Sequence, residues 1–247
     1  MRKEKILSVK ICSSKESEIL RSLDKRIKKG IPTVIFTPNT RMLLQANASP
    51  AFLRILNSSS LNIPDGSGIL IASRMLGGNI KHRITGIDFA SSLLALAEKR
   101  GYRVFLLGAE RGIAKKAKKN LKTLFPKLKI CGTHHGYFKK SGKENEKLLK
   151  KISSSHPDIL FVCLGSPIQE KWITKNARQI NSVKLSIGLG GSLDVWAGKV
   201  SRAPKIIQIA GLEWLYRTIK EPKRARIFLD IPVFLFKVLR SKRGQNP

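Results

Sequence analysis

Short apolar runs alternate along the chain with longer stretches in which apolar residues recur at helical spacing. The short runs predict buried strands, and they span residues 33–37, 103–108, 158–165 and 183–188. The longer stretches predict helices over residues 16–29, 86–100, 111–125, 143–154 and 167–181. This alternation predicts an α/β fold with a Rossmann-like, largely parallel sheet flanked by helices.

The alternation ends near residue 195, after which no further strands are predicted. Residues 203–220 and 227–240 instead predict helices whose aromatic and aliphatic faces are flanked by Arg and Lys. We therefore expect an α/β core over 1–195 and a basic, amphipathic helical appendage over 196–247. Its longest apolar run, 231–236, is far shorter than the roughly 20 residues that cross a bilayer, so an interfacial helix is expected there.

The charge of the chain is unusual, because 48 Lys and Arg against 16 Asp and Glu give a net charge of +32. This excess predicts an anionic partner, and nucleic acid, anionic lipid head groups and phosphorylated substrates satisfy it equally well. The three cysteines form no CxxC pair, which is typical of a protein of the reducing cytoplasm. Residues 1–10 lack the apolar core of a signal peptide, so no export is expected.

Glycine and polar residues gather directly after the predicted strands. In an open α/β sheet, ligands bind outside the carboxyl ends of the strands. The candidate positions are 37–39, 64–66, 108–112, 165–170 and 188–192. Glycines let backbone N–H groups approach a phosphate, so a ligand with a diphosphate is expected. Each fragment alone is typical of an ordinary turn, since none has the spacing of a P-loop or of a complete GxGxxG motif.

Asp65 is the carboxylate placed best for catalysis. Its Pro-Asp-Gly context is by itself typical of a turn, but Asp65 also follows a predicted strand and precedes a helix that begins near Ser67. This places a carboxylate at the sheet edge, where a sugar hydroxyl could lie within hydrogen-bonding reach.

Neither a metal nor a cofactor is expected. The chain has no Asp-x-Asp pair, and the adjacent His134 and His135 stand apart from the carboxylates. The charge of a nucleotide diphosphate would instead be met by backbone amides and by Arg83, Arg217 or Arg224.

Several longer segments occur in a fixed order between about residues 5 and 227. They include Pro64-Asp65-Gly66-Ser67-Gly68, Arg83-Ile84-Thr85-Gly86-Ile87-Asp88, Gly108-Ala109, Gly165-Ser166-Pro167 with Gln169-Glu170, Gly188-Leu189-Gly190-Gly191, Arg202-Ala203-Pro204 and Gly211-Leu212-Glu213-Trp214-Leu215-Tyr216-Arg217. In this order and over this length, they resemble the WecG/TagA/CpsF glycosyltransferase family.

The resemblance implies an inverting, metal-independent transfer of N-acetylmannosamine, or its uronic acid, from a UDP-sugar to a polyprenyl-diphosphate-linked N-acetylglucosamine. Such a reaction belongs to the biosynthesis of cell-surface polysaccharide or teichoic acid. By this analogy Asp65 would be the general base that deprotonates the acceptor hydroxyl as it attacks the anomeric carbon.

The resemblance also implies roles in substrate binding. Thr37 and Asn39 would hold the sugar, and Arg83 and Gln169 would position sugar or diphosphate groups. Arg217 and Arg224 would fold over the site as a lid and neutralise the departing UDP. The remaining positions expected to bind substrate are Gly108, Ala109, Gly190 and Gly191.

Two positions depart from the family pattern. Ile168 stands where the family usually has a basic residue, so one phosphate contact is missing. Ile227 stands where an arginine is expected, with Arg226 one place early, which on a helix turns the side chain by roughly 100°. Which of Arg217, Arg224 and Arg226 reaches the diphosphate therefore stays open.

The basic appendage suits an anionic membrane surface, since each charge near the surface contributes on the order of 1 kcal/mol. A cytoplasmic protein, peripheral on the inner face of the cytoplasmic membrane, is expected, and a homo-oligomer is compatible with the sequence. One alternative is a UDP-hexose transferase of the same family with another donor, such as a glucosyl donor. The other, a nucleic-acid-binding α/β protein, is favoured by charge alone, because no RRM, KH or zinc-finger signature occurs.

Overall fold

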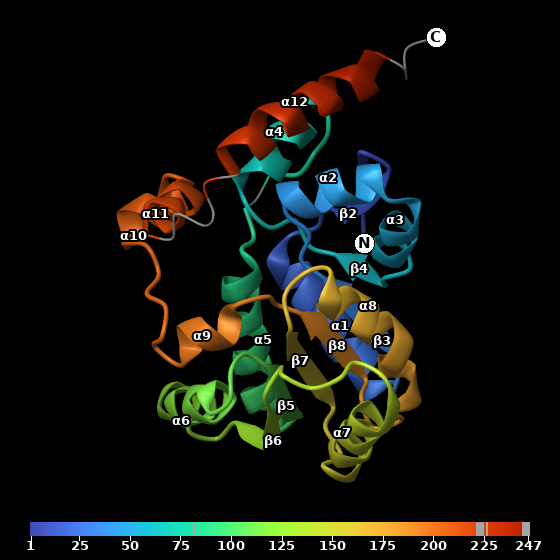
Figure 1. Ribbon diagram of the computed structural model, residues 1–247, viewed down its shortest axis with the longest axis vertical. Helices are drawn as coiled ribbons and strands as arrows, with labels where there is room; N and C mark the ends of the chain where they lie inside the picture. The colour runs from blue at the N-terminus through green and yellow to red at the C-terminus, as the bar shows by residue number, and fades with distance from the viewer. Residues whose placement is uncertain (82, 221–224, 226, 244–247) are drawn as a thin grey trace.

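The computed structural model describes residues 1–247 except 82, 221–224, 226 and 244–247, and a six-stranded parallel sheet lies at its centre (Figure 1). The strand order is β4-β3-β8-β7-β5-β6, and every neighbouring pair is parallel. The strands are β3 (Thr33–Phe36), β4 (Leu61–Asn62), β5 (Arg103–Gly108), β6 (Lys129–His134), β7 (Ile159–Cys163) and β8 (Leu185–Gly188). The predicted Rossmann-like α/β fold is confirmed.

Helices cover both faces of this sheet. One face packs against α1 (Glu16–Lys28), α5 (Gly86–Arg100), α6 (Ile113–Leu124) and α9 (Ser192–Trp196). The other packs against α2 (Thr40–Ala48), α3 (Pro50–Asn57), α4 (Ser67–Met75), α7 (Gly142–Ser154), α8 (Ile168–Asn176) and η1 (Ala177–Gln179). In β5, Val104 and Leu106 face the first layer and Phe105 and Leu107 the second. Because both faces are covered, the strand is a continuous apolar run rather than an alternating one.

The predicted helices are found within a few residues of their expected bounds, with 167–181 divided into α8 and η1. An antiparallel hairpin, β1 (Lys3–Ile6) and β2 (Val9–Cys12), and the edge strand β6 were not predicted. Charged or polar residues interrupt the apolar ones in all three segments, so no continuous apolar run marks them. In β6, for example, only Ile130 is fully buried.

The predicted helix over 203–220 is two helices, α10 (Lys205–Ile209) and α11 (Glu213–Lys220). The break lies at Gly211, whose φ of +77° is a conformation that favours glycine. The last helix, α12 (Ile227–Arg243), lies across α2 and α4 (Figure 1). Its Phe234 and Val238 are fully buried in the core on the face of the sheet that α2, α3 and α4 cover.

The boundary at 195 between core and appendage stays a prediction. The described residues include no helix that is both long and apolar enough to span a bilayer.

Candidate active site

The loops that leave the carboxyl ends of β3, β4 and β8 are joined by direct contacts at one edge of the sheet. The hydroxyl of Thr37 is buried and donates a hydrogen bond to the backbone oxygen of Gly188 at 3.0 Å. Thr37 also lies against Gly86, where an added Cβ would be 3.3 Å from the threonine oxygen. Asn39 caps α2, since its Oδ1 accepts a hydrogen bond from Met42 N at 3.1 Å.

Asp65 lies at this edge, half-buried between β4 and α4. Its backbone N–H donates to Pro38 O at 3.0 Å, which joins the loops after β3 and β4. Its Oδ1 accepts a hydrogen bond at 3.1 Å from Gly86 N, at the start of α5. The carboxylate is therefore oriented by a helix N-terminus, where a negative charge is favoured.

The first turn of α5 carries a second carboxylate. Thr85 is the N-cap and accepts a hydrogen bond from Asp88 N at 3.2 Å. Asp88 forms a bidentate ion pair with Arg202, with N–O distances of 2.5 and 3.1 Å. Burial alone would raise the pKa of Asp88, but hydrogen bonds from Arg202 and Thr85 outweigh it and hold the pKa below its usual value.

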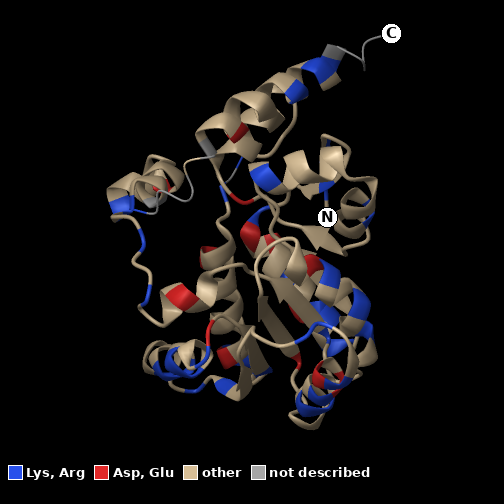
Figure 2. Cartoon of the chain, viewed as in Figure 1, with Lys and Arg blue, Asp and Glu red and all other residues tan. Residues whose placement is uncertain are grey.

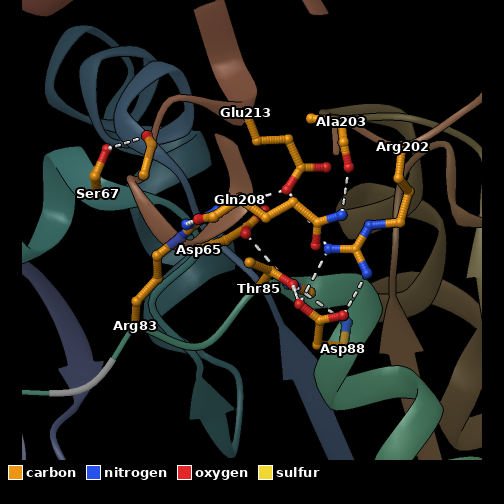
Figure 3. Close-up of polar contacts among 11 residues, drawn as sticks. Asp65, Ser67, Arg83, Thr85, Asp88, Arg202, Ala203, Gln208 and Glu213 are labelled. Atoms are coloured by element: carbon orange, nitrogen blue, oxygen red, sulfur yellow. Dashed lines mark hydrogen bonds and ion pairs between the residues drawn. The ribbon is translucent and has the colours of Figure 1, made fainter. Parts of the chain in front are cut away.

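Arg83 connects this edge to the C-terminal part of the chain (Figure 3). Its Nη1 donates to the backbone oxygen of Gln208, and its Nη2 lies 3.5 Å from Oε2 of Glu213. The hydroxyl of Ser67 donates to Gly211 O at 3.3 Å. The α10–α11 segment is thus docked beside Asp65. The expected contact of Arg83 with substrate stays a prediction.

Gln169 is almost fully buried, and both ends of its amide bind within the protein. Oε1 accepts a hydrogen bond from Gly190 N at 2.8 Å, and Nε2 donates to Oε1 of Glu170 at 2.7 Å. An added Cβ at Gly188 would lie 3.0 Å from the Gln169 amide nitrogen. Gln169 therefore supports the loop after β8. Its expected contact with substrate also stays a prediction.

Gly108 and Ala109 lie at the end of β5, where the backbone closely approaches that of β7. Gly108 has a φ of +139°, and a Cβ there would lie 2.1 Å from the backbone oxygen of Cys163. The N–H of Ala109 donates to the same oxygen at 3.1 Å, and Ala109 O accepts from Gly136 N at 2.7 Å. The Ala109 N–H therefore already has a hydrogen-bond partner within the protein. A phosphate in this loop would have to be bound by the amides that follow.

Other candidate residues lie at the margin of this edge. Gly191 precedes α9, and Ile168 begins α8 with its side chain about half exposed. Arg217 lies in α11, although only its backbone is described, and Arg224 and Arg226 lie outside the described residues. Burial lowers the pKa of both His134 and His135. In the part of the chain that the structure describes, no three His, Cys, Asp or Glu side chains gather as a metal site.

Sequence reasoning assigned no role to Asp88, Arg202 or Glu213, which the structure places beside Asp65. All three occur in the motifs that carry the family resemblance. Their positions in those motifs could have identified them as candidates. The motifs do not indicate which of them form pairs, because Asp88 and Arg202 are 114 residues apart.

Comparison with known proteins gives a match over nearly the whole chain. The model for the "Glycosyl transferase WecG/TagA/CpsF family" matches residues 4–247. A relative from Bacillus subtilis (strain 168), named N-acetylglucosaminyldiphosphoundecaprenol N-acetyl-beta-D-mannosaminyltransferase, is 34% identical over 100% of this chain and 94% of its own length. A protein of the same name from Staphylococcus aureus (strain MRSA252) is 36% identical over 85% of this chain and 80% of its own length.

Glu170 gives the site a pH-dependent contribution to stability. Its carboxyl is fully buried, and Oε2 has no hydrogen-bond partner among the described residues. Burial raises its pKa above the usual value, and the hydrogen bond from Gln169 offsets this only in part. The folded protein therefore binds this proton more tightly than the unfolded chain. The resulting stability is present below the pKa of the unfolded chain, about 4.3, and is lost as pH rises through the folded pKa.

We predict that Glu170→Gln stabilises the protein at pH 8 but not at pH 4, because glutamine does not ionise. Urea unfolding at both pH values measures this difference. Glu146→Gln makes the same chemical change on the exposed face of α7 and is expected to stay within about 0.5 kcal/mol of the unaltered protein at both. An equal effect of Glu170→Gln at pH 4 and pH 8 would contradict the prediction.

Proposed function

The chain belongs to the WecG/TagA/CpsF family of glycosyltransferases, and we propose that it transfers N-acetylmannosamine from UDP to an N-acetylglucosamine carried on a polyprenyl diphosphate. The observation that carries this proposal is the 34% identity to an N-acetylmannosaminyltransferase along the entire chain. The arrangement around Asp65 supports it, since a carboxylate oriented by a helix N-terminus stands at the sheet edge where α/β folds bind ligands.

In the proposed mechanism Asp65 acts as the general base. It takes the proton from the acceptor hydroxyl as that oxygen forms a bond to the anomeric carbon of the donor. The bond between this carbon and the diphosphate oxygen breaks, and UDP leaves with the electron pair. A single displacement of this kind inverts the anomeric centre and needs only one carboxylate.

We propose that cations of the protein, rather than a metal, neutralise the departing diphosphate. Arg83 is a candidate for this role, because its guanidinium lies beside the Asp65 loop (Figure 3). Arg217 lies four residues beyond Glu213, in a helix docked on that loop. This placement supports the idea that α10–α11 covers the site as a lid, with Arg217 and Arg224 contributing charge.

Membrane association is the second part of the proposal, with the protein peripheral on the cytoplasmic face. Large apolar side chains are exposed along the C-terminal helices, among them Ile206 (81%), Ile209 (86%) and Phe236 (65%). A groove of about 620 Å³ between α12 and α2 adds further apolar surface beside Lys237 and Arg240. Apolar side chains next to cations suit an interface with anionic lipid.

The net charge alone does not support this location. Lys and Arg cover α6 and α7 as well as the end of α12, so they form no single patch (Figure 2). The exposed apolar residues of α10–α12 therefore carry the argument for membrane association.

The donor is tested by measuring UDP release in EDTA, with a lipid-linked N-acetylglucosamine acceptor. We expect acceptor-dependent release from UDP-N-acetylmannosamine and none from UDP-glucose or UDP-N-acetylglucosamine. Reactions without acceptor are the control for hydrolysis. Release from UDP-glucose alone would replace the proposed donor, and release that requires added Mg²⁺ would reject the metal-independent mechanism.

The base is tested with Asp65→Asn, which keeps an oxygen to accept the Gly86 hydrogen bond but removes the proton acceptor. We expect kcat to fall about 100-fold or more. Asp158→Asn is the matched control, because Asp158 is also half-buried and accepts a backbone hydrogen bond from Arg103. It lies at the amino ends of β5 and β7, away from the carboxyl ends that carry the site. A folded Asp65→Asn protein with near-normal turnover would show that another group is the base.

The membrane proposal is tested by cosedimentation with vesicles that contain phosphatidylglycerol. Replacing Ile206 and Ile209 with serine is expected to weaken binding by about tenfold or more, because two apolar side chains no longer enter the interface. Leu124→Ser, which removes an exposed apolar side chain (68%) on α6, should bind as the unaltered protein does. Equal binding of all three proteins would show that the α10–α11 segment does not contact the membrane.

A further inference from the structure

Four charged side chains of alternating sign form a network next to Asp65 (Figure 3). Oε2 of Glu213 lies 3.5 Å from Nη2 of Arg83 and 3.5 Å from Nη2 of Arg202. Arg202 in turn binds both carboxylate oxygens of Asp88. The Glu213 side chain is only 12% exposed, so this carboxylate is shielded from solvent and shared between two guanidinium groups.

The network joins two parts of the site that are far apart in sequence. Arg83 lies three residues before Gly86, whose N–H orients Asp65, and Asp88 lies two residues after Gly86. Glu213 begins α11, and Arg202 lies just before α10. One carboxylate therefore connects the docked C-terminal helices to both sides of the helix N-terminus that holds the candidate base.

The carboxylate also keeps two like charges together. Arg83 and Arg202 are both mostly buried, with 21% and 25% of their side chains exposed. Screening by water is weak at such positions, so the two guanidinium groups would repel each other without a shared anion. Nη1 of Arg83 donates a hydrogen bond to the backbone oxygen of Gln208, which fixes the same guanidinium to α10.

We propose that Glu213 is a positioning residue for sugar transfer. Its carboxylate holds Arg83 and Arg202 in place and thereby orients α10–α11 and the start of α5 around Asp65, without touching the reacting atoms. This inference rests on the proposed function, since Arg83 matters to turnover only if a charged leaving group departs beside it.

The kinetic test compares Glu213→Gln with Glu213→Asp. Glutamine keeps the length but loses the charge, so we expect kcat/KM for the donor to fall about tenfold or more, equivalent to about 1.4 kcal/mol. Aspartate keeps the charge and should recover part of this loss. The acidic limb of the pH profile should remain in both variants, because Asp65 still accepts the proton.

Asp24→Asn is the matched control. Asp24 is 11% exposed and also lies between two cations, 3.3 Å from Lys28 and 2.8 Å from Arg100. This pairing lies at the opposite end of α5, remote from Asp65. We expect Asp24→Asn to lower the free energy of unfolding while leaving kcat/KM within about twofold of the unaltered enzyme, so that a general loss of stability is distinguished from a change at the site.

Hydrogen exchange provides a readout independent of activity. Amides of residues 205–220 should exchange faster in Glu213→Gln and at the unaltered rate in Asp24→Asn. The inference is overturned if Glu213→Gln changes neither kcat/KM nor this exchange, or if it abolishes the acidic limb, which would make Glu213 a proton acceptor. If the unaltered protein releases UDP from no donor, the proposed function fails, and exchange alone decides whether Glu213 fastens α10–α11.

Discussion

The hydrogen bond from Gly86 N to the carboxylate of Asp65 joins the loop after β4 to the start of α5, and the arrangement of the site depends on it. Glycine at 86 allows the close contact with Thr37, whose hydroxyl in turn holds β8. A side chain at 86 would bring a Cβ to 3.3 Å from the Thr37 oxygen, so Thr37 would have to shift slightly to accommodate it. The orientation of one carboxylate is thus set by packing between segments that begin at three different strands.

The strands buried on both faces could be predicted because their sequences leave little alternative. β7 is a continuous apolar run, and β5 and β8 are apolar apart from Arg103 and Ser186, as expected where helices cover both sides of a parallel sheet. The edge strand β6 and the hairpin β1–β2 were missed because charged or polar residues interrupt their apolar ones, which gives a weaker pattern. The break at Gly211 was missed because the apolar spacing continues across it.

The candidate site was predictable to a similar extent. Since parallel strands end at the same edge, Thr37 and Asp65 could be placed near each other from the sequence. The partners of Arg83 could not, because Glu213 lies 130 residues away and its approach depends on how α10 and α11 dock. The internal contacts of Gln169 were likewise hidden, since a polar side chain after a strand resembles a ligand-binding group whether it faces a ligand or the protein.

Charge balance near Asp65 differs from that of the whole chain. The protein carries +32, yet Arg83 and Arg202 are matched beside Asp65 by Glu213 and Asp88. In the proposed reaction the leaving diphosphate adds negative charge to this nearly neutral group, so further cations must be supplied from elsewhere in the protein. The C-terminal segment is suited to supply them, because α10–α11 already lies on the Asp65 loop and the arginines at 217 and 224 follow Glu213 in sequence. A carboxylate that fastens this segment would then bring the added positive charge to the point where it is needed.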